Sequence, residues 1–126
     1  MHHNSKEHRA LVQWAADCAE RVLPLAEANG DKRARQAISA ARGFAAGKNS
    51  VDHARRAAEA AHAAAREAGT DAARNAARAA GHAAETAHVP AHGPHAANYA
   101  LKAVIAAGGD DEAEEKWQDE RVPAIG

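Results

Sequence analysis

Histidines are the residues of this chain whose type and spacing most favour chemistry, and the densest group is His88, His92 and His95. Three imidazoles within eight residues suit zinc, copper or nickel, which use two to four such ligands. His82 joins this group if the end of the preceding helix folds back, and Glu85 is the nearest carboxylate. Intervening prolines prevent a simple i, i+4 pair on one helix. The pattern therefore leaves open a metal site, a partner-binding surface, or imidazoles that cap helix ends.

A weak internal similarity brings His62 into register with His82. Residues 57–66 (AAEAAHAAAR) and 77–86 (ARAAGHAAET) match at a 20-residue offset. One interpretation is a tandem array of helical hairpins. The other is an ordinary helical bundle, in which the abundance of alanine produces the match.

The sequence offers no assembled catalytic motif. Cys18 is the only cysteine, so an intrachain disulfide is excluded. It shares an apolar helix face with Ala15 and Val22, where a thiol behaves as a small hydrophobe. No glycine-rich phosphate loop, HExxH, GxSxG or EF-hand loop occurs. We therefore predict no catalytic residue and no required cofactor, with zinc, copper or nickel as the alternative.

The charge pattern argues against nucleic acid and membrane as partners. Arginines alternate with carboxylates at three- or four-residue spacing, as Arg55 and Glu59 do, which is typical of a solvated helix face. The formal net charge is −1, and no aromatic residues interleave the arginines, so nucleic-acid binding is not expected. No window approaches 18 uncharged apolar residues, so no membrane span is expected. The polar N-terminus lacks a signal-peptide core, which favours the cytoplasm.

Composition predicts the fold that must position these residues. Alanine accounts for 39 of 126 residues, and only 19 larger apolar residues remain. Such a chain lacks the β-branched and aromatic residues of a β-sandwich or barrel. We predict an all-α protein: one domain over residues 1–126, a compact bundle of about five helices plus a short C-terminal helix. The alanine faces would allow close helix packing, and any face left over would form a homodimer seam.

Periodicity, caps and glycines set the expected elements. The expected helices cover about 5–28, kinked or split by Pro24, then 31–47 with Asp31 as N-cap, 51–69 after Ser50, about 71–88 after Thr70 or Asp71, and 94–107. Residues 1–7 are expected to form a flexible arm, and His2, His3 and His8 are assigned to this polar N-terminal arm. Residues 110–126 form an acidic segment expected to dock through Trp117. The expected core anchors are Trp14, Phe44, Leu101, Ile105 and Trp117.

Three stretches of the chain resemble a known family. They are the run at 8–20 (HRALVQWAADCAE), the middle segments at 81–89 (GHAAETAHV) and 99–103 (YALKA), and the end at 117–123 (WQDERVP). They resemble short bacterial proteins described as putative immunity proteins of toxin–immunity systems. Such sequences are often mislabelled as a subunit of an exonuclease, a large ATPase with a phosphate loop and a long coiled coil. This chain has neither feature.

The resemblance implies a small all-helical protein that binds and neutralises a cognate toxin. It brings no catalytic site, so the matching residues enter only as motif positions. The candidate partner- or ligand-binding residues are Trp14, Asp17, His62, His82, His88, His92, Tyr99 and Lys102.

Several functions stay open on the sequence alone. The leading one is a non-enzymatic binding module that occludes a toxin's active site through an exposed helical face. The alternative is a histidine-rich protein that binds a metal or small ligand, with His88, His92 and His95 as the metal ligands. A third is an amphipathic chain that folds only on drying or on a membrane. The defined helix caps and the two separated tryptophans argue against this third function.

Overall fold

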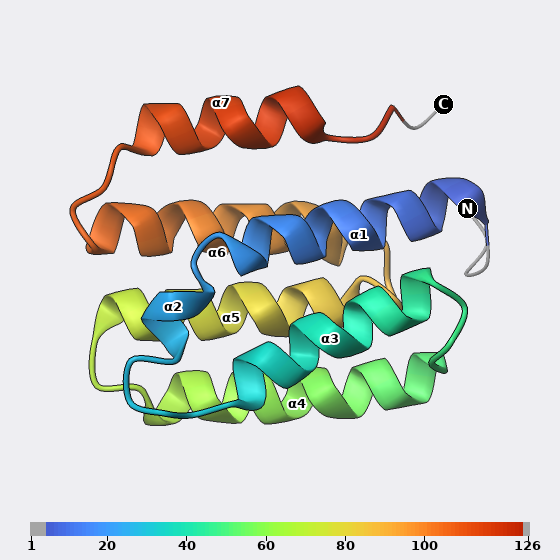
Figure 1. Cartoon of the computed structure of the whole chain (residues 1–126), viewed down its shortest axis with the longest axis horizontal. Coiled ribbons are helices and arrows are strands. Elements are labelled where there is room, and N and C mark those ends of the chain that lie inside the picture. Colours follow the sequence, from blue (N-terminus) through green and yellow to red (C-terminus); the bar gives the residue numbers. More distant parts are fainter. Residues whose placement is uncertain (1–4, 125–126) are drawn as a thin grey trace.

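The structure, a computed structural model, describes residues 5–124, which form seven α-helices without a strand (Figure 1). The helices are α1 (Lys6–Glu20), α2 (Leu23–Ala26), α3 (Arg33–Ala45), α4 (Val51–Glu67), α5 (Asp71–Glu85), α6 (His92–Ala106) and α7 (Asp111–Arg121). The all-α class is therefore confirmed. The helix count is one higher than predicted, because the first predicted helix is divided into α1 and α2.

Helix α5 lies at the centre of the molecule. It contacts α1, α2, α3, α4 and α6. Figure 1 shows α4, α5, α6 and α7 stacked in chain order, with α1, α2 and α3 packed across one side of this stack. No described helix is both long and apolar enough to cross a membrane. The histidine of α5, His82, is thus held by a helix with neighbours on several sides.

Pro24 causes the division between α1 and α2. It lies in the first turn of α2, where a missing backbone N–H leaves no helical hydrogen bond unmade. In a continuous helix the carbonyl of Glu20 would have no donor at Pro24. The predicted kink or split is confirmed as a split.

Side-chain caps begin α4 at the predicted Ser50 and α5 at Thr70, one of the two starting points that the sequence leaves open. The Ser50 hydroxyl accepts from the His53 amide at 3.0 Å, and the Thr70 hydroxyl accepts from the Ala73 amide at 3.1 Å. The predicted cap of α3 is wrong by one residue. Lys32 is the N-cap, while the Asp31 carboxylate accepts from the Arg33 amide just inside the helix at 2.9 Å.

The central position of α5 explains its composition. Its buried residues are Ala76, Ala77, Ala79, Ala80, Gly81, Ala83 and Ala84, which occupy more than one face of the helix. Side chains of this size let several helices approach one axis closely. Such a core buries little area per residue, so it depends on alanine's helix propensity and on tight packing.

His8 corrects the predicted N-terminal arm. Helix α1 begins at Lys6 after the Ser5 cap, and His8 is fully buried. Its Nε2 atom lies 2.6 Å from the Thr86 carbonyl oxygen, and its ring lies 5.5 Å from that of Phe44. His8 is thus a core residue that joins α1 to the end of α5. His2 and His3 lie outside the described residues.

The five predicted anchors are buried, partly buried or exposed in the structure. Trp14 and Phe44 are buried, as expected, whereas Leu101 and Trp117 are only partly buried. Ile105 is 54% exposed, so its assignment to the core is wrong. The physical reason is that α6 packs through a row of small residues, namely Ala96, Ala97, Ala100 and Ala103. Ile105 falls outside this row.

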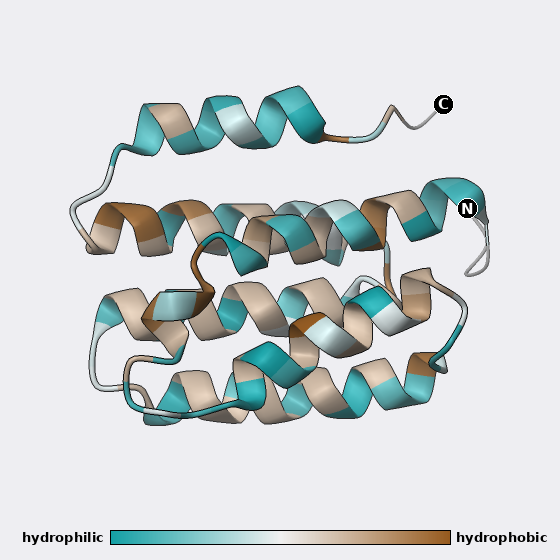
Figure 2. Ribbon diagram, in the orientation of Figure 1, coloured by the Kyte–Doolittle hydropathy of each residue, from teal (hydrophilic) through white to brown (hydrophobic). Residues whose placement is uncertain are grey.

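Helix α7 is held mainly by polar contacts. The Trp14 indole N–H donates to the Gln118 carbonyl at 3.1 Å, and the Gln118 amide donates to the Ala97 carbonyl at 2.9 Å. The Arg21 guanidinium lies 2.8 Å from the buried carboxylate of Glu114 and 4.2 Å from the centre of the Trp117 ring. Figure 2 shows α7 as the most continuously hydrophilic helix.

Candidate functional site

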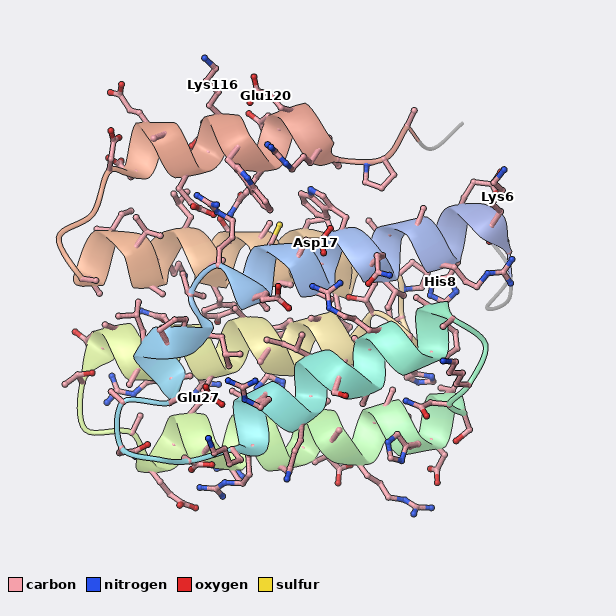
Figure 3. The ribbon with its side chains drawn as sticks, in the orientation of Figure 1. Lys6, His8, Asp17, Glu27, Lys116 and Glu120 are labelled. Carbon is pink, nitrogen blue, oxygen red and sulfur yellow. The ribbon has the colours of Figure 1, made fainter. Side chains whose placement is uncertain are left out.

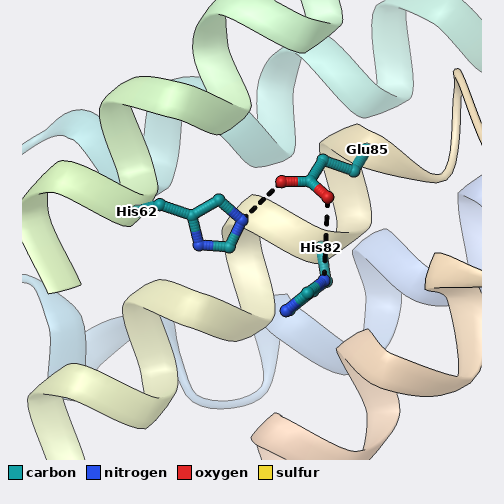
Figure 4. A group of neighbouring side chains, drawn as sticks. All are labelled: His62, His82 and Glu85. Atoms are coloured by element: carbon teal, nitrogen blue, oxygen red, sulfur yellow. Dashed lines mark hydrogen bonds and ion pairs between the residues drawn. The ribbon is translucent and has the colours of Figure 1, made fainter.

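Four side chains from three helices converge beside α5. The Nε2 atom of His62, from α4, lies 2.6 Å from Oε1 of Glu85, from α5 (Figure 4). His92, from the start of α6, places Nε2 3.1 Å from the other oxygen of Glu85. The Nδ1 atoms of His82 and His92 lie 2.9 Å apart. We refer to His62, His82, Glu85 and His92 as the histidine cluster.

Local structure explains how the cluster is built. His82 and Glu85 are three residues apart, so they share one face of α5. His62 lies over Gly81, where an added Cβ would come within 2.6–2.9 Å of the imidazole ring. Glycine at position 81 therefore makes the space that brings His62 to Glu85.

The connector between α5 and α6 brings His92 to the cluster. Helix α6 begins at His92, two residues earlier than the predicted start at Pro94. A proline is tolerated in the first turn because those N–H groups have no intrahelical partner. The early start makes His92 the first residue of a helix packed directly on α5.

Aromatic stacking extends the cluster along α6. The Tyr99 ring stacks on His82 with centroids 5.0 Å apart and planes at 6°. His92 also stacks on His82, at 5.1 Å and 22°, and the Lys102 ammonium lies 4.8 Å from the Tyr99 ring centre. These contacts hold the His82 ring between those of Tyr99 and His92 on the α5–α6 surface.

Burial controls the electrostatics of the cluster. Burial, followed by the neighbouring His62, lowers the pKa of His82 to about 4. Burial also lowers the pKa of His92, whereas the hydrogen bond from His62 lowers the pKa of Glu85. At neutral pH the cluster therefore combines neutral His82 and His92 imidazoles with an ionised carboxylate.

One atom of the cluster has an unusual environment. The Nδ1 atom of His62 is the single buried side-chain nitrogen or oxygen of residues 5–124 that lacks a hydrogen-bond partner. Buried polar atoms are normally paired, because leaving one unsatisfied costs free energy. The short contact between His62 Nε2 and Glu85 therefore holds this imidazole in an orientation that leaves its Nδ1 atom without a hydrogen-bond partner.

The structure brings only some of the predicted binding residues together. His62, His82, His92, Tyr99 and Lys102 form one continuous surface across α4, α5 and α6. Trp14 is buried against α7, and the carboxylate of Asp17, which is labelled in Figure 3, pairs with Arg42 of α3 at 2.8 Å. The contacts of Trp14 and Asp17 thus serve the packing of helices.

The potential metal ligands are regrouped relative to the prediction. Among the described residues, the group whose ligand atoms all lie within 4.8 Å of one another is His62, His82 and Glu85. Only His92 of the predicted trio belongs to the histidine cluster. His88 is exposed in the turn after α5, and the exposed His95 contacts His82 and His92 through its ring.

Two residues of the site had only weak signals in the sequence. Glu85 follows His82 by three residues on the polar face of its helix, and His62 matches His82 in the 20-residue offset. Neither pattern predicts that α4 and α5 pack with His62 and Glu85 facing each other. The role of Gly81 had no signal, because its importance depends on which side chain lies above it.

The fold and the site define a small all-helical protein with a polar, histidine-rich surface. A family model described as "Imm-5 like putative immunity protein" matches residues 1–125. This chain therefore belongs to that family, as the resemblance implied. No curated protein and no solved structure matches the chain.

Proposed function

We propose that this protein is the immunity partner of a bacterial toxin, which it neutralises by binding and occluding the toxin's active site. The observation that carries the proposal is the family match over residues 1–125. The rigid helical bundle supports it, because a preformed surface loses little conformational entropy on binding.

The surface we propose for the toxin is the α5–α6 face that carries His82, His92, Tyr99 and Lys102. Tyrosine is enriched among the residues that contribute most to binding at protein interfaces, since its ring combines apolar area with a polar end. Here the ring is held on His82, and Lys102 lies above it. Exposed His88 lies in the adjoining turn and extends this proposed face.

The mechanism we propose is stoichiometric and non-enzymatic. Occlusion requires one immunity protein for each toxin molecule, whereas an enzyme that modified the toxin would act at a small fraction of that amount. Titrating the chain into a fixed amount of active toxin should abolish activity at a 1:1 ratio. Full protection at a much lower ratio would contradict occlusion. The proposal places both proteins in the cytoplasm and leaves a homodimer as a prediction.

The direct test is co-expression with the product of a neighbouring toxin-like gene. The wild-type chain should restore growth and form a complex with that product. Absence of both rescue and complex would overturn the immunity proposal.

A charge reversal tests the proposed face. Lys102→Glu should weaken the complex at least about tenfold, since a like-charge contact or a lost anchor costs more than about 1.4 kcal/mol. The matched control is Lys48→Glu in the exposed α3–α4 turn, which should leave affinity unchanged. If both variants bind like the wild type, the α5–α6 face is excluded while the immunity role stands.

A further inference from the structure

We propose that the histidine cluster is a binding site for a divalent transition-metal ion, Zn²⁺ by its donor set. The ligands are a ring nitrogen of His62, a ring nitrogen of His82 and a carboxylate oxygen of Glu85, and the adjacent His92 is the fourth ligand once its side chain turns one nitrogen toward the ion. The proposal does not require the proposed toxin complex, although both involve His82 and His92, and it adds a ligand that neither the family match nor the fold assigns.

The separations between donor atoms carry the proposal. Ligand atoms about 2.1 Å from a Zn²⁺ ion lie about 3.4 Å apart in a tetrahedral site. In the cluster, one ligand atom from each of His62, His82 and Glu85 lies within 4.8 Å of the other two, and Nε2 of His62 lies 2.6 Å from Oε1 of Glu85. The Nδ1 atom of His82 lies farther from Glu85, at 3.9 Å from its Oε2 atom. The side chains of His62, His82 and Glu85 therefore converge closely enough for small shifts to bring one atom from each to a single zinc ion.

The donor chemistry matches the same ion. Histidine nitrogen and glutamate oxygen are ordinary zinc ligands, and zinc has no preferred geometry of its own to impose. One ionised carboxylate offsets half of the ion's charge. His92 approaches the same group with Nε2 3.1 Å from Glu85 and Nδ1 2.9 Å from Nδ1 of His82, and one of these two nitrogens would bind the ion.

The location gives the ion both access and a structural effect. A shallow hollow lined by Glu59, His62, Arg66, Arg78 and His82 opens from solvent onto the cluster. The four side chains are 15–27% exposed, so the site is half-buried and reachable. Its ligands come from α4, α5 and α6, so binding would tie three helices together.

The first experiment measures zinc binding by the full chain after treatment with EDTA. Calorimetry should show one high-affinity site per chain, and the melting temperature should rise with Zn²⁺ concentration because the ion binds the folded state. Co²⁺ in place of Zn²⁺ should give the visible absorption bands of a tetrahedral site. Absence of binding, or a Co²⁺ spectrum without those bands, would overturn the proposal.

Ligand variants locate the site. His62→Ala and Glu85→Gln should each lower Zn²⁺ affinity by at least about 10–100-fold, the loss typical of removing even a supporting group. His53→Ala, an exposed histidine of the same α4, is the matched control and should bind like the wild type. Loss of binding in His88→Ala but not in His62→Ala would place the ion elsewhere and refute this site.

Gly81→Ala separates geometry from ligand identity. This substitution keeps every ligand. Its new Cβ, however, would lie 2.6–2.9 Å from the present position of the His62 ring and would displace that ring. The metal-free variant should still fold, since alanine's preference for a helix interior over glycine offsets part of the cost of displacing the His62 ring. Its Zn²⁺ affinity should nevertheless fall at least about tenfold. The control is Gly69→Ala, where an added Cβ meets nothing; equal zinc affinity of both variants and the wild type would contradict the proposed geometry.

Discussion

Cys18 shows how a single residue's chemistry is set by its surroundings. The thiol is fully buried, and burial raises its pKa to about 12, with a smaller effect from the negative charges of Glu114 and Asp17. The thiolate is the reactive form of cysteine, so a thiol of this kind is inert at physiological pH. The structure thus supports the sequence's interpretation of Cys18 as a core residue.

We predict that Cys18 in the native protein resists alkylation by iodoacetamide at pH 8. The thiol should react at the rate of a free cysteine once urea unfolds the chain, because its pKa then returns to its ordinary value. Mass spectrometry at successive times measures both rates. Rapid modification without denaturant would show that α1 and α7 open more readily than their contacts indicate.

His8 gives the second prediction at this scale. His8→Ala removes a fully buried ring and leaves the Thr86 carbonyl without its contact at 2.6 Å. We expect the free energy of unfolding to fall by about 2–4 kcal/mol, the range for a buried side chain plus an unsatisfied polar group. Urea denaturation followed by circular dichroism measures the change. The exposed His53→Ala should change it by less than about 0.5 kcal/mol, and an equally small effect of His8→Ala would contradict its role in the core.

At the scale of elements, α7 differs from the other helices. Its buried residues are Glu114 and Gln118, both polar, and Figure 3 shows the side chains of Lys116 and Glu120 pointing away from the bundle. Its attachment therefore depends on a few hydrogen bonds with definite geometry. Helices α4, α5 and α6 are joined by rows of alanine instead, which share the energy among many small contacts.

We predict that Glu114→Ala detaches α7 before it unfolds the bundle. The change leaves Arg21 without the carboxylate at 2.8 Å, at a cost of about 1–3 kcal/mol. Hydrogen exchange should accelerate in residues 111–121 while the amides of α5 stay protected. Glu115→Ala, which alters an exposed neighbour on the same helix, is the control. Uniformly faster exchange throughout the protein would show instead that α7 belongs to the cooperative core.

At the scale of the whole molecule, stability depends on small side chains around α5. Ala80 and Ala61 are fully buried, and larger side chains at such positions would push helices apart. This explains why an alanine-rich chain with few large apolar residues still forms a core. Stability is distributed over the contacts of α5 with five other helices.

Ala80→Leu tests this packing. We expect the free energy of unfolding to fall by about 1–3 kcal/mol, because extra methylene groups in a tightly packed core force side chains and backbone to shift. Thermal and urea melts measure the loss. Ala10→Leu, on the exposed side of α1, should have an effect within about 0.5 kcal/mol. If Ala80→Leu is neutral or stabilising, the helices around α5 are not closely packed.

The sequence by itself determined the helices, because helix formation depends on local information. Alanine content, the caps at Ser50 and Thr70, and Pro24 act within one turn of where they stand, and these predictions agree with the structure. The family likeness likewise depends only on residue order. Cap residues and helix ends were predicted to within a few residues for the same reason.

Only the tertiary structure decided which faces meet. It buried His8, exposed Ile105, and joined His62 of α4 to Glu85 of α5 instead of grouping His88 with His92 and His95. In a chain where alanine occupies several faces of each helix, periodicity does not distinguish the face that packs from the face that does not. The choice follows from contacts between residues far apart in sequence, such as the 2.6 Å contact of His8 with Thr86 and the space that Gly81 leaves for His62.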